Sequence, residues 1–582
     1  MDPNRRMNVE EPLAMLQAMS EDQSDGGEKT EGESDEGAVN DSSFLSEEEE
    51  TSSEDWEPTS RKRPRVLLAE RPPTSLPRLS HQPADAVRDV PVSAHHDSLE
   101  TGMDGTVWKT ENPGPLTGRV QSHNVLIEEA GPTAHARRNI GDPLGALMCL
   151  MDPVMLQHIC DCTVAEARRC GEAGWELGMA ELKAFIALLL ARGVHIGRNV
   201  NVEELWSQEW GLPFFSTTMA RGRYREIMRF LHFDEKDTRH IRLENDKFAL
   251  VSEVWNRFVQ NSIACYKPGS EITVAEQLLP TKSQCPFTQH MPNKPDKYGI
   301  QFWLAVDVES KYMLNGFPYL GRDLSRSAAQ SLGESVVLEL MEPFLWKRRN
   351  VTTDSFFTSL PLAHKLLAKN TGLVGTTNSK NRSLPPSAHR QATLFTTKVM
   401  QSDGVTLTIY QGKNGKKLCI LSTMHASVEI CADAERKPET VHYYNRTKVG
   451  VDMLDKMLRR HSVRAATRRW PVAVFYNILD IAAMNACVLY RSCTGSHMAR
   501  RVFILELCKL LRDEHISKPP VDILPTFPNK RRNCGVKRNC TNNKTTKTCM
   551  ECRRGVCGQC TGRVHIVCAD CVCGHRSTIT TI

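Results

Sequence analysis

Apolar residues recur at helical spacing from about residue 120 to residue 266, as in GMAELKAFIALLLARGVHIG and KFALVSEVWNRFVQNSI, and predict a helical region. From about residue 271 the pattern becomes typical of strands. EITVAEQLL predicts one strand, and GIQFWLAVDVESKYMLNGFPYL predicts two strands joined by a turn near residues 309–311. RNVTTDSFFTS then predicts a strand, and PLAHKLLAKNTG a helix capped by Gly372. Alternating strands and helices indicate an α/β domain.

Three short β-rich runs between residues 373 and 431 (TLFTTKVM, VTLTIYQG and LCILSTMH) predict a small insertion into this domain. KVGVDMLDKMLRRHS predicts a further helix. WPVAVFYNILDIAAMNACVLY predicts a long apolar helix that is buried or lies at an interface. The proline-rich linker PPVDILPTFP separates these elements from a cysteine-rich tail.

Residues 1 to about 115 are predicted to be disordered, because they are rich in Glu, Ser, Asp, Gly and Pro and contain few apolar residues. The basic cluster RKRPR at residues 61–65 is interpreted as a nuclear import signal, with a patch that balances the acidic run as the alternative. No run of 18 or more apolar residues predicts a transmembrane span, and the N-terminus lacks the features of a signal peptide. We therefore expect an intracellular, nuclear protein with no membrane partner.

The net charge of +5 combines opposite charges at the two ends of the chain. Residues 1–50 carry 16 Asp and Glu against three Lys and Arg, whereas residues 530–582 carry 11 Lys and Arg against two acids. The basic tail favours a nucleic-acid partner. A predicted helix in TMARGRYREIMRFLHF has a basic face that is either solvated or a surface for the DNA backbone; its arginines are Arg221, Arg223, Arg225 and Arg229.

Nine of the 20 cysteines lie between Cys534 and Cys573, where C-x2-C pairs recur. In a chain without a signal peptide this clustering indicates zinc rather than disulfides. Eight thiolates suit two structural Zn²⁺ ions in tetrahedral sites, interleaved as a cross-brace that binds DNA or protein. The predicted first site is Cys534, Cys540, Cys557 and Cys560, and the second is Cys549, Cys552, Cys568 and Cys571, with His565, Cys573 and His575 as alternatives for the looser ligands.

Carboxylates form a second constellation. Asp452 and Asp455 lie three residues apart on a predicted helix and therefore point to one side, while Asp354 ends a predicted strand. Such a set is typical of Mg²⁺-dependent phosphoryl transfer, which uses three or four carboxylates around two cations. An aspartate at a strand end is, on its own, more often a turn former or a helix cap.

The motifs TVAEQLLPTKSQCPFTQHMPNKPDKYGIQFWLAVD, NVTTDSFFTSLPLAHKLL, LVGTTNSKNRSLP and YYNRTKVGVDMLDKM together resemble the piggyBac family of DNA transposases and the host proteins derived from them. The resemblance runs from about residue 120 to the end of the chain. It implies an α/β, ribonuclease H-like catalytic core with a β-rich insertion, a split helical domain for DNA binding and dimerisation, and a cross-brace zinc finger.

Pattern and resemblance together divide the chain into seven segments. They are a disordered acidic region (1–115), the first helical segment (116–266), the first part of the core (267–372), the insertion (373–431), the last part of the core (432–456), the second helical segment (457–529) and the zinc finger (530–582).

The resemblance implies Mg²⁺-dependent cut-and-paste transposition by a homodimer that binds terminal repeats and a TTAA target in double-stranded DNA. The family uses aspartates at four positions, and three of them match Asp354, Asp452 and Asp455. Ala275 stands at the first position, and its methyl group cannot bind a cation. Glu276 would need a bulge to reach the same face of a strand, and nothing in the spacing favours Asp307 on the neighbouring strand.

Three functions remain open from the sequence. The first is a DNA-binding protein of transposase origin that is deficient in strand cleavage. The second is an active transposase in which another carboxylate completes the site. The third is a chromatin or protein-interaction module that uses the zinc tail.

Overall fold

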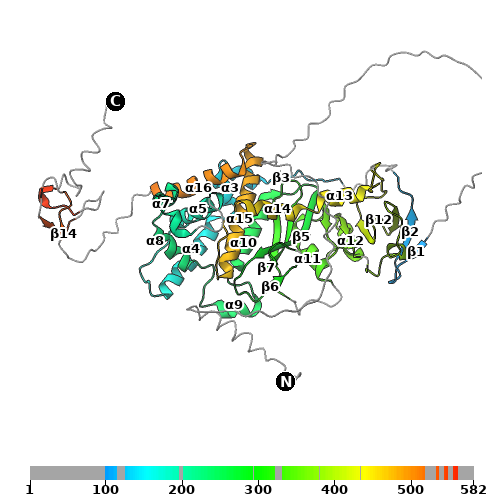
Figure 1. Cartoon of the computed structure of the whole chain (residues 1–582), viewed down its shortest axis with the longest axis horizontal. Helices are drawn as coiled ribbons and strands as arrows, with labels where there is room; N and C mark the ends of the chain where they lie inside the picture. Colours follow the sequence, from blue (N-terminus) through cyan, green and yellow to red (C-terminus); the bar gives the residue numbers. More distant parts are fainter. Residues whose placement is uncertain are drawn as a thin grey trace, which may run out of the picture.

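The computed structural model describes residues 99–114, 125–195, 201–292, 294–321, 331–378, 380–432 and 434–517 (Figure 1). In the tail it describes residues 532–536, 540, 543–547 and 555–560. The basic cluster at residues 61–65 lies outside the described residues, as do Cys549, Cys552, Cys568 and Cys571.

The described strands form an 11-stranded mixed sheet in the order β1-β2-β11-β12-β13-β10-β9-β5-β7-β6, with β8 also paired to β7. The strands are β1 (Leu99–Thr101), β2 (Val107–Glu111), β5 (Glu271–Pro280), β6 (Thr288–His290), β7 (Tyr298–Asp307), β8 (Met313–Pro318), β9 (Asn350–Thr353), β10 (Gly372–Thr376), β11 (Thr397–Ser402), β12 (Val405–Lys413) and β13 (Lys416–Ser422). Two short pairs lie apart from it: β3 (Gly131–Pro132) with β4 (Tyr266–Lys267), and β14 (Arg532–Asn533) with β15 (Lys544–Thr545).

The middle of the sheet is its parallel part. β9 pairs in parallel with both β5 and β10, whereas every other pair in the sheet is antiparallel. All of β7 except Tyr298 is buried, because helices cover the sheet there, and this explains its nearly continuous apolar run. The predicted hairpin is confirmed: β7 pairs with β8 across a turn at residues 308–312.

Residues 99–114 correct the expectation of disorder up to residue 115. Their two strands form a hairpin, and β2 pairs with β11 from Val399↔Glu111 to Gln401↔Lys109. Trp108 is fully buried, and its indole N–H donates to the backbone oxygen of Ser383 at 2.7 Å. Composition alone did not reveal these strands, because a few apolar residues are enough to form them when a strand that is distant in the sequence provides the hydrogen-bond partner.

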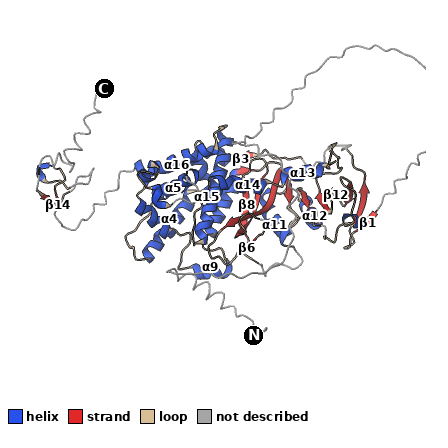
Figure 2. Ribbon diagram, viewed as in Figure 1, coloured by secondary structure: helices blue, strands red, loops and turns tan. Residues whose placement is uncertain are grey.

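The helices are α2 (Ala134–Asn139), α3 (Pro143–Leu150), α4 (Pro153–Arg169), α5 (Met179–His195), α6 (Val202–Leu205), α7 (Pro213–Thr218), α8 (Arg221–Phe230), α9 (Arg239–Asn245), α10 (Ser252–Cys265), α11 (Leu332–Met341), α12 (Leu360–Leu367), α13 (Glu439–Thr447), α14 (Gly450–Arg460), α15 (Trp470–Thr494) and α16 (Arg500–Ser517). Most of them gather at one end of the molecule, whereas α11, α12 and α13 lie beside the strands, which run from its middle to the other end (Figure 2). Single 3₁₀ turns occupy Glu342–Phe344, Pro386–Ala388 and Gly558–Cys560.

Helix α15 is the apolar helix that the sequence predicts to be buried or at an interface. It is long and apolar enough to cross a membrane, but 94% of its most apolar window is buried inside the protein. It packs on α3, α10 and α16, and its Asn485 side chain pairs with both backbone groups of Met313 in β8 at 2.9 Å. The helix is therefore buried at the centre of the protein, where it contacts both the helical region and the sheet.

The end of α12 differs from the sequence prediction. The helix ends at Leu367, and Gly372 lies in β10 rather than in a helix cap. Asn370 takes the left-handed conformation instead, with φ of 49°. Asparagine tolerates this conformation better than most residues, so the turn forms without glycine.

Candidate active site and metal-binding residues

Ala275 lies in the middle of β5, opposite Leu304 of β7. Thr273 and Gln277 share its face of the strand, because side chains alternate along a strand. The Thr273 hydroxyl donates to the Thr447 carbonyl oxygen at 2.6 Å, where α13 ends. The face of β5 that carries Ala275 is therefore the one covered by α13 and α14.

Asp354 is the first residue after β9. The parallel register ends at Val274↔Thr353. Asp354 therefore follows at the C-terminal end of β9, next to the level of Ala275 in β5. Its Oδ1 accepts a hydrogen bond from the backbone N–H of Phe356 at 2.9 Å, so the side chain also closes the turn. Asp354 therefore forms the turn, as weighed in the sequence analysis, and also lies near the site.

Helix α14 begins at Gly450, directly against β5. A Cβ atom at this position would lie 2.5 Å from the Thr273 hydroxyl oxygen and 2.9 Å from its Cβ. Only glycine lets the helix approach the strand so closely. The contact brings Asp452 and Asp455, one helical turn further on, over the Ala275 face.

Gln277 fixes the position of Asp455. Its side-chain N–H donates to Asp455 Oδ1 at 2.6 Å, and its carbonyl oxygen accepts from Asn477 of α15 at 2.8 Å. The sequence analysis assigned no role to Gln277 or Asn477. The signal that could have revealed them is two amide side chains within otherwise apolar runs, because buried polar groups need partners.

Lys294, in the loop between β6 and β7, points into this group of carboxylates. Its Nζ lies 3.3 Å from Asp452 Oδ1 and donates to the Glu276 carbonyl oxygen at 3.2 Å. The same loop contacts α14 again through Asp296 and Arg459, which lie 3.5 Å apart. A fixed ammonium group thus contributes positive charge at the site.

Burial raises the pKa of the carboxyls around Lys294. Burial, and then the charge of Asp354, raise the pKa of Glu276 to about 7. Burial raises the pKa of Asp455 to about 6, although the bond from Gln277 and the charge of Lys294 oppose the shift. The pKa of Asp354 is raised by burial as well. The buried carboxyls of this site are therefore protonated more readily than exposed carboxyls.

These residues do not fit a two-cation site as they stand. Among the described residues, no three of the carboxylates of Glu276, Asp354, Asp452 and Asp455 have oxygen atoms that all lie within 4.8 Å of one another. Ala275 supplies no oxygen, and the Lys294 ammonium already binds Asp452. Both features lower the affinity for a divalent cation, because carboxylates and their net negative charge hold Mg²⁺.

The described part of the tail brings four thiols together. The sulfur atoms of Cys534, Cys540, Cys557 and Cys560 all lie within 4.8 Å of one another, and those of Cys540 and Cys557 are 3.6 Å apart. The Asn543 side chain donates to Cys557 Sγ at 3.5 Å and is the main cause that lowers the pKa of this thiol to about 6. The four thiols are the set predicted for the first site, and their chemistry fits Zn²⁺.

Comparison with known proteins places the chain in a family. The family model described as Transposase IS4 matches residues 142–487, which include β5, β9 and α14. A cryo-EM structure of a piggyBac transposase synaptic complex with hairpin DNA is similar, with 29% identity and a TM-score of 0.64 over 76% of this chain and 100% of that chain. This chain belongs to the piggyBac-type transposase family. The resemblance stated from the motifs is confirmed.

Two carboxylates were weighed as substitutes for the missing aspartate of this transposase. Asp307 accepts from the N–H of Gly269 and from the N–H and hydroxyl of Ser310 at 2.6–2.8 Å, so it closes the β7–β8 turn, three residue pairs from Ala275. Glu276 follows Ala275 in a regular register without a bulge. Among the described residues, its buried Oε2 has no hydrogen-bond partner, and the charge of Asp354 acts on it.

Two of the four arginines of α8 form ion pairs within the fold itself. Arg223 binds Glu181 at 2.7 Å through two nitrogens and lies over the Trp175 ring at 4.4 Å, and Arg225 pairs with Glu203. For Arg223 and Arg225, these contacts weigh against a role as free contacts to the DNA backbone. The two interpretations could not be separated from arginine spacing alone.

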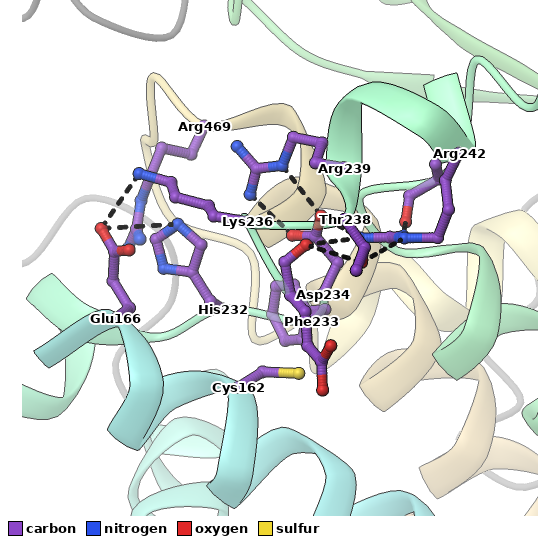
Figure 3. A network of polar contacts seen from close by, with 12 residues as sticks. Cys162, Glu166, His232, Phe233, Asp234, Lys236, Thr238, Arg239, Arg242 and Arg469 are labelled. Atoms are coloured by element: carbon purple, nitrogen blue, oxygen red, sulfur yellow. Dashed lines mark hydrogen bonds and ion pairs between the residues drawn. The ribbon is translucent and has the colours of Figure 1, made fainter. Parts of the chain in front are cut away.

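Between α8 and α9 along the chain, a polar network holds the connecting segment in place (Figure 3). The buried Asp234 accepts from Arg239 and Arg242 at 2.7–2.8 Å. Glu166 of α4 accepts from Lys236 at 3.2 Å. The two acids are nearly inaccessible to solvent, and Lys236, Arg239 and Arg242 each already have a carboxylate partner, so the network is structural.

Proposed function

We propose that this chain is a DNA-binding protein of transposase origin in which strand cleavage is crippled. The observation that carries the proposal is Ala275, which stands where β5, the turn at Asp354 and α14 converge. The other three aspartates of the family pattern are present, so the pattern lacks one oxygen ligand.

Cleavage in this family depends on divalent cations, which would activate a water and stabilise the leaving oxygen of the DNA strand. The methyl group of Ala275 neither binds a cation nor offsets its charge. We expect a rate lower by at least about 10²–10³ than that of the same chain with an aspartate at this position. Lys294 adds to the defect, because its ammonium competes for Asp452.

DNA binding is supported by family membership and by the similar piggyBac transposase structure, which is a complex with hairpin DNA. The basic tail adds attraction for phosphates. We further propose that the chain acts as a homodimer on terminal repeats and TTAA sites in double-stranded DNA. Its location would be the nucleus, with residues 61–65 as the import signal.

The tail is proposed to hold structural Zn²⁺. Cys534, Cys540, Cys557 and Cys560 would supply four thiolates to one ion, and the second proposed set lies outside the described residues. Zinc would fold the tail, because the described part has only a small apolar cluster around Val536 and Val556.

The alternative is an active transposase in which Glu276 takes the place of the missing aspartate. The unpartnered Glu276 Oε2 beside Asp354 favours it. Against it stands the regular register of β5, which turns Glu276 away from the Ala275 face.

Cleavage of a labelled duplex that ends in TTAA plus the element's terminal repeat, with Mg²⁺ or Mn²⁺, separates these functions. We expect Ala275→Asp to cut and the chain itself to bind without cutting. Ala275→Asn is the matched control, because it adds the same shape without a charge. If the unaltered chain cuts as fast as Ala275→Asp and Glu276→Gln abolishes the cutting, the alternative holds and our proposal fails.

A further inference from the structure

Three potential metal ligands meet where the start of one helix lies against the ends of two others, in the helical region that precedes β5. His135 lies in the first turn of α2, Cys149 is the second-last residue of α3, and Cys265 is the last residue of α10. One imidazole nitrogen and the two sulfur atoms all lie within 4.8 Å of one another.

Hydrogen bonds join the start of α2 to the end of α10, and the end of α10 to the end of α3. The N–H of Thr133, which caps α2, donates to the Cys265 carbonyl oxygen at 2.9 Å, and the Thr133 hydroxyl donates to the Ala264 carbonyl oxygen at 2.8 Å. The Cys265 thiol donates to the Cys149 carbonyl oxygen at 3.6 Å. The three ligands are therefore positioned by packing of α2, α3 and α10, and not by a flexible loop.

We propose that His135, Cys149 and Cys265 form a Zn²⁺ site that is separate from the zinc finger and from the catalytic carboxylates. Two thiolates and a neutral imidazole match the ligands that zinc prefers, and they balance its charge. Ligand atoms in a tetrahedral zinc site lie about 3.8 Å apart, as follows from bond lengths of about 2.0–2.3 Å. The present separations close to that value through small side-chain rotations.

The surroundings suit such an ion. Asn139 lies 3.4 Å from Nδ1 of His135, which leaves Nε2 for the metal and gives the ring a partner that fixes its orientation. His135 is exposed, so an ion can enter, whereas Cys265 is 1% exposed. Cys493, near the end of α15, interacts electrostatically with both thiols but is not among the ligand atoms that lie within 4.8 Å of one another. Without zinc, this site is a packed pair of thiols beside an exposed histidine.

Native mass spectrometry of the full-length chain, purified under reducing conditions and loaded with Zn²⁺, tests the site. We expect His135→Ala to hold one zinc ion fewer per chain than the unaltered protein in the presence of a competing chelator. His240→Ala, which removes another exposed histidine, is the matched control and is expected to keep the full number. Zinc in the tail is the same in all three proteins and cancels in the comparison.

Loading with Co²⁺ gives a second readout, because thiolate ligands produce charge-transfer absorption that Cys149→Ser should reduce and Cys285→Ser should not. His135 is exposed, so its replacement is not expected to unfold the chain, and equal thermal unfolding in chelator would verify this. Equal zinc contents of His135→Ala and the unaltered chain would overturn the proposal. So would a Cys149–Cys265 disulfide in the freshly isolated protein.

Discussion

The ammonium group of Lys294 lies 3.3 Å from a carboxylate oxygen of Asp452, across the face of β5 that carries Ala275. Lys294 also donates to the Glu276 carbonyl oxygen, so it links the loop before β7, the central strand and α14. Its charge lowers the pKa values of Glu276, Asp354 and Asp455, opposing the effect of burial. The Lys294 ammonium group thus offsets part of the negative charge that would attract a divalent cation.

Replacing Lys294 should strengthen metal binding. In Lys294→Met the carboxylates lose their fixed positive partner. We expect Mn²⁺ to bind up to about 5-fold more tightly, since Asp452 is 71% exposed and an ion pair with an exposed partner is worth about 1 kcal/mol or less. Titration followed by electron paramagnetic resonance of free Mn²⁺ measures this. Lys456→Met is the control, because Lys456 is an exposed lysine of α14, the helix that carries Asp452. Unchanged Mn²⁺ affinity in Lys294→Met would show that the ammonium does not compete with the cation.

The close approach of α14 to β5 predicts a cost for Gly450→Ala. The new Cβ would lie 2.5 Å from the Thr273 hydroxyl oxygen, so the helix must move away from the strand. We expect the free energy of unfolding to fall by about 1–3 kcal/mol, as for other overpacked sites.

Gly222→Ala in α8 serves as the control for Gly450→Ala, because nothing lies within 4 Å of its Cβ position. Alanine there should leave the free energy of unfolding unchanged or raise it by about 0.5–1 kcal/mol. Urea unfolding of both variants provides the comparison. Equal stability of the two variants would mean that α14 has room to spare.

Glu166 predicts a pH-dependent contribution to stability. Although burial opposes the shift, hydrogen bonds from Arg169 and the charges of His232 and Lys236 lower its pKa from 4.5 to about 2. A carboxyl whose pKa is lowered by folding stabilises the folded state above its unfolded pKa, and this contribution is lost as the pH falls from about 4.5 towards 2. Glu166→Gln should therefore destabilise the protein by about 1–3 kcal/mol at pH 7 and by less at pH 4.

Unfolding in urea at the two pH values checks the prediction for Glu166. Glu253→Gln is the matched control, because its side chain is 70% exposed and pairs only with His158 among the described ion pairs. Its effect should be below about 1 kcal/mol at both pH values. A loss in Glu166→Gln that does not change between pH 7 and pH 4 would contradict the role of charge.

Loss of one tail thiol should release zinc. We expect Cys557→Ser to lower the zinc content by one ion per chain relative to Cys285→Ser, which changes a half-buried cysteine outside the tail. The variant should also bind DNA more weakly at low salt, because an unfolded tail no longer presents its basic residues as one surface. Zinc analysis and DNA titrations at several salt concentrations measure the two effects. Equal zinc contents would refute the assignment of Cys557.

The type of each element near the site followed from local patterning. Runs of β-favouring residues predicted β5 and the β7–β8 hairpin, and helical spacing predicted α14 with Asp452 and Asp455 on one side. The spacing of the tail cysteines predicted which four thiols would meet. These features are encoded within short stretches of chain, where periodicity and ligand spacing are direct physical signals.

Contacts between distant segments were decided only by the tertiary structure. Lys294 and Asp452 are 158 residues apart, and Gln277 and Asp455 are 178 residues apart. The pairing of β2 with β11, which overturns the expected disorder of residues 99–114, belongs to the same class. Patterning states which face of an element is buried but not which element covers it. That choice depends on the order of strands in the sheet and on the helices packed across it. The sequence alone therefore indicated the candidate catalytic aspartates and the alanine at position 275, and the fold determined what surrounds them.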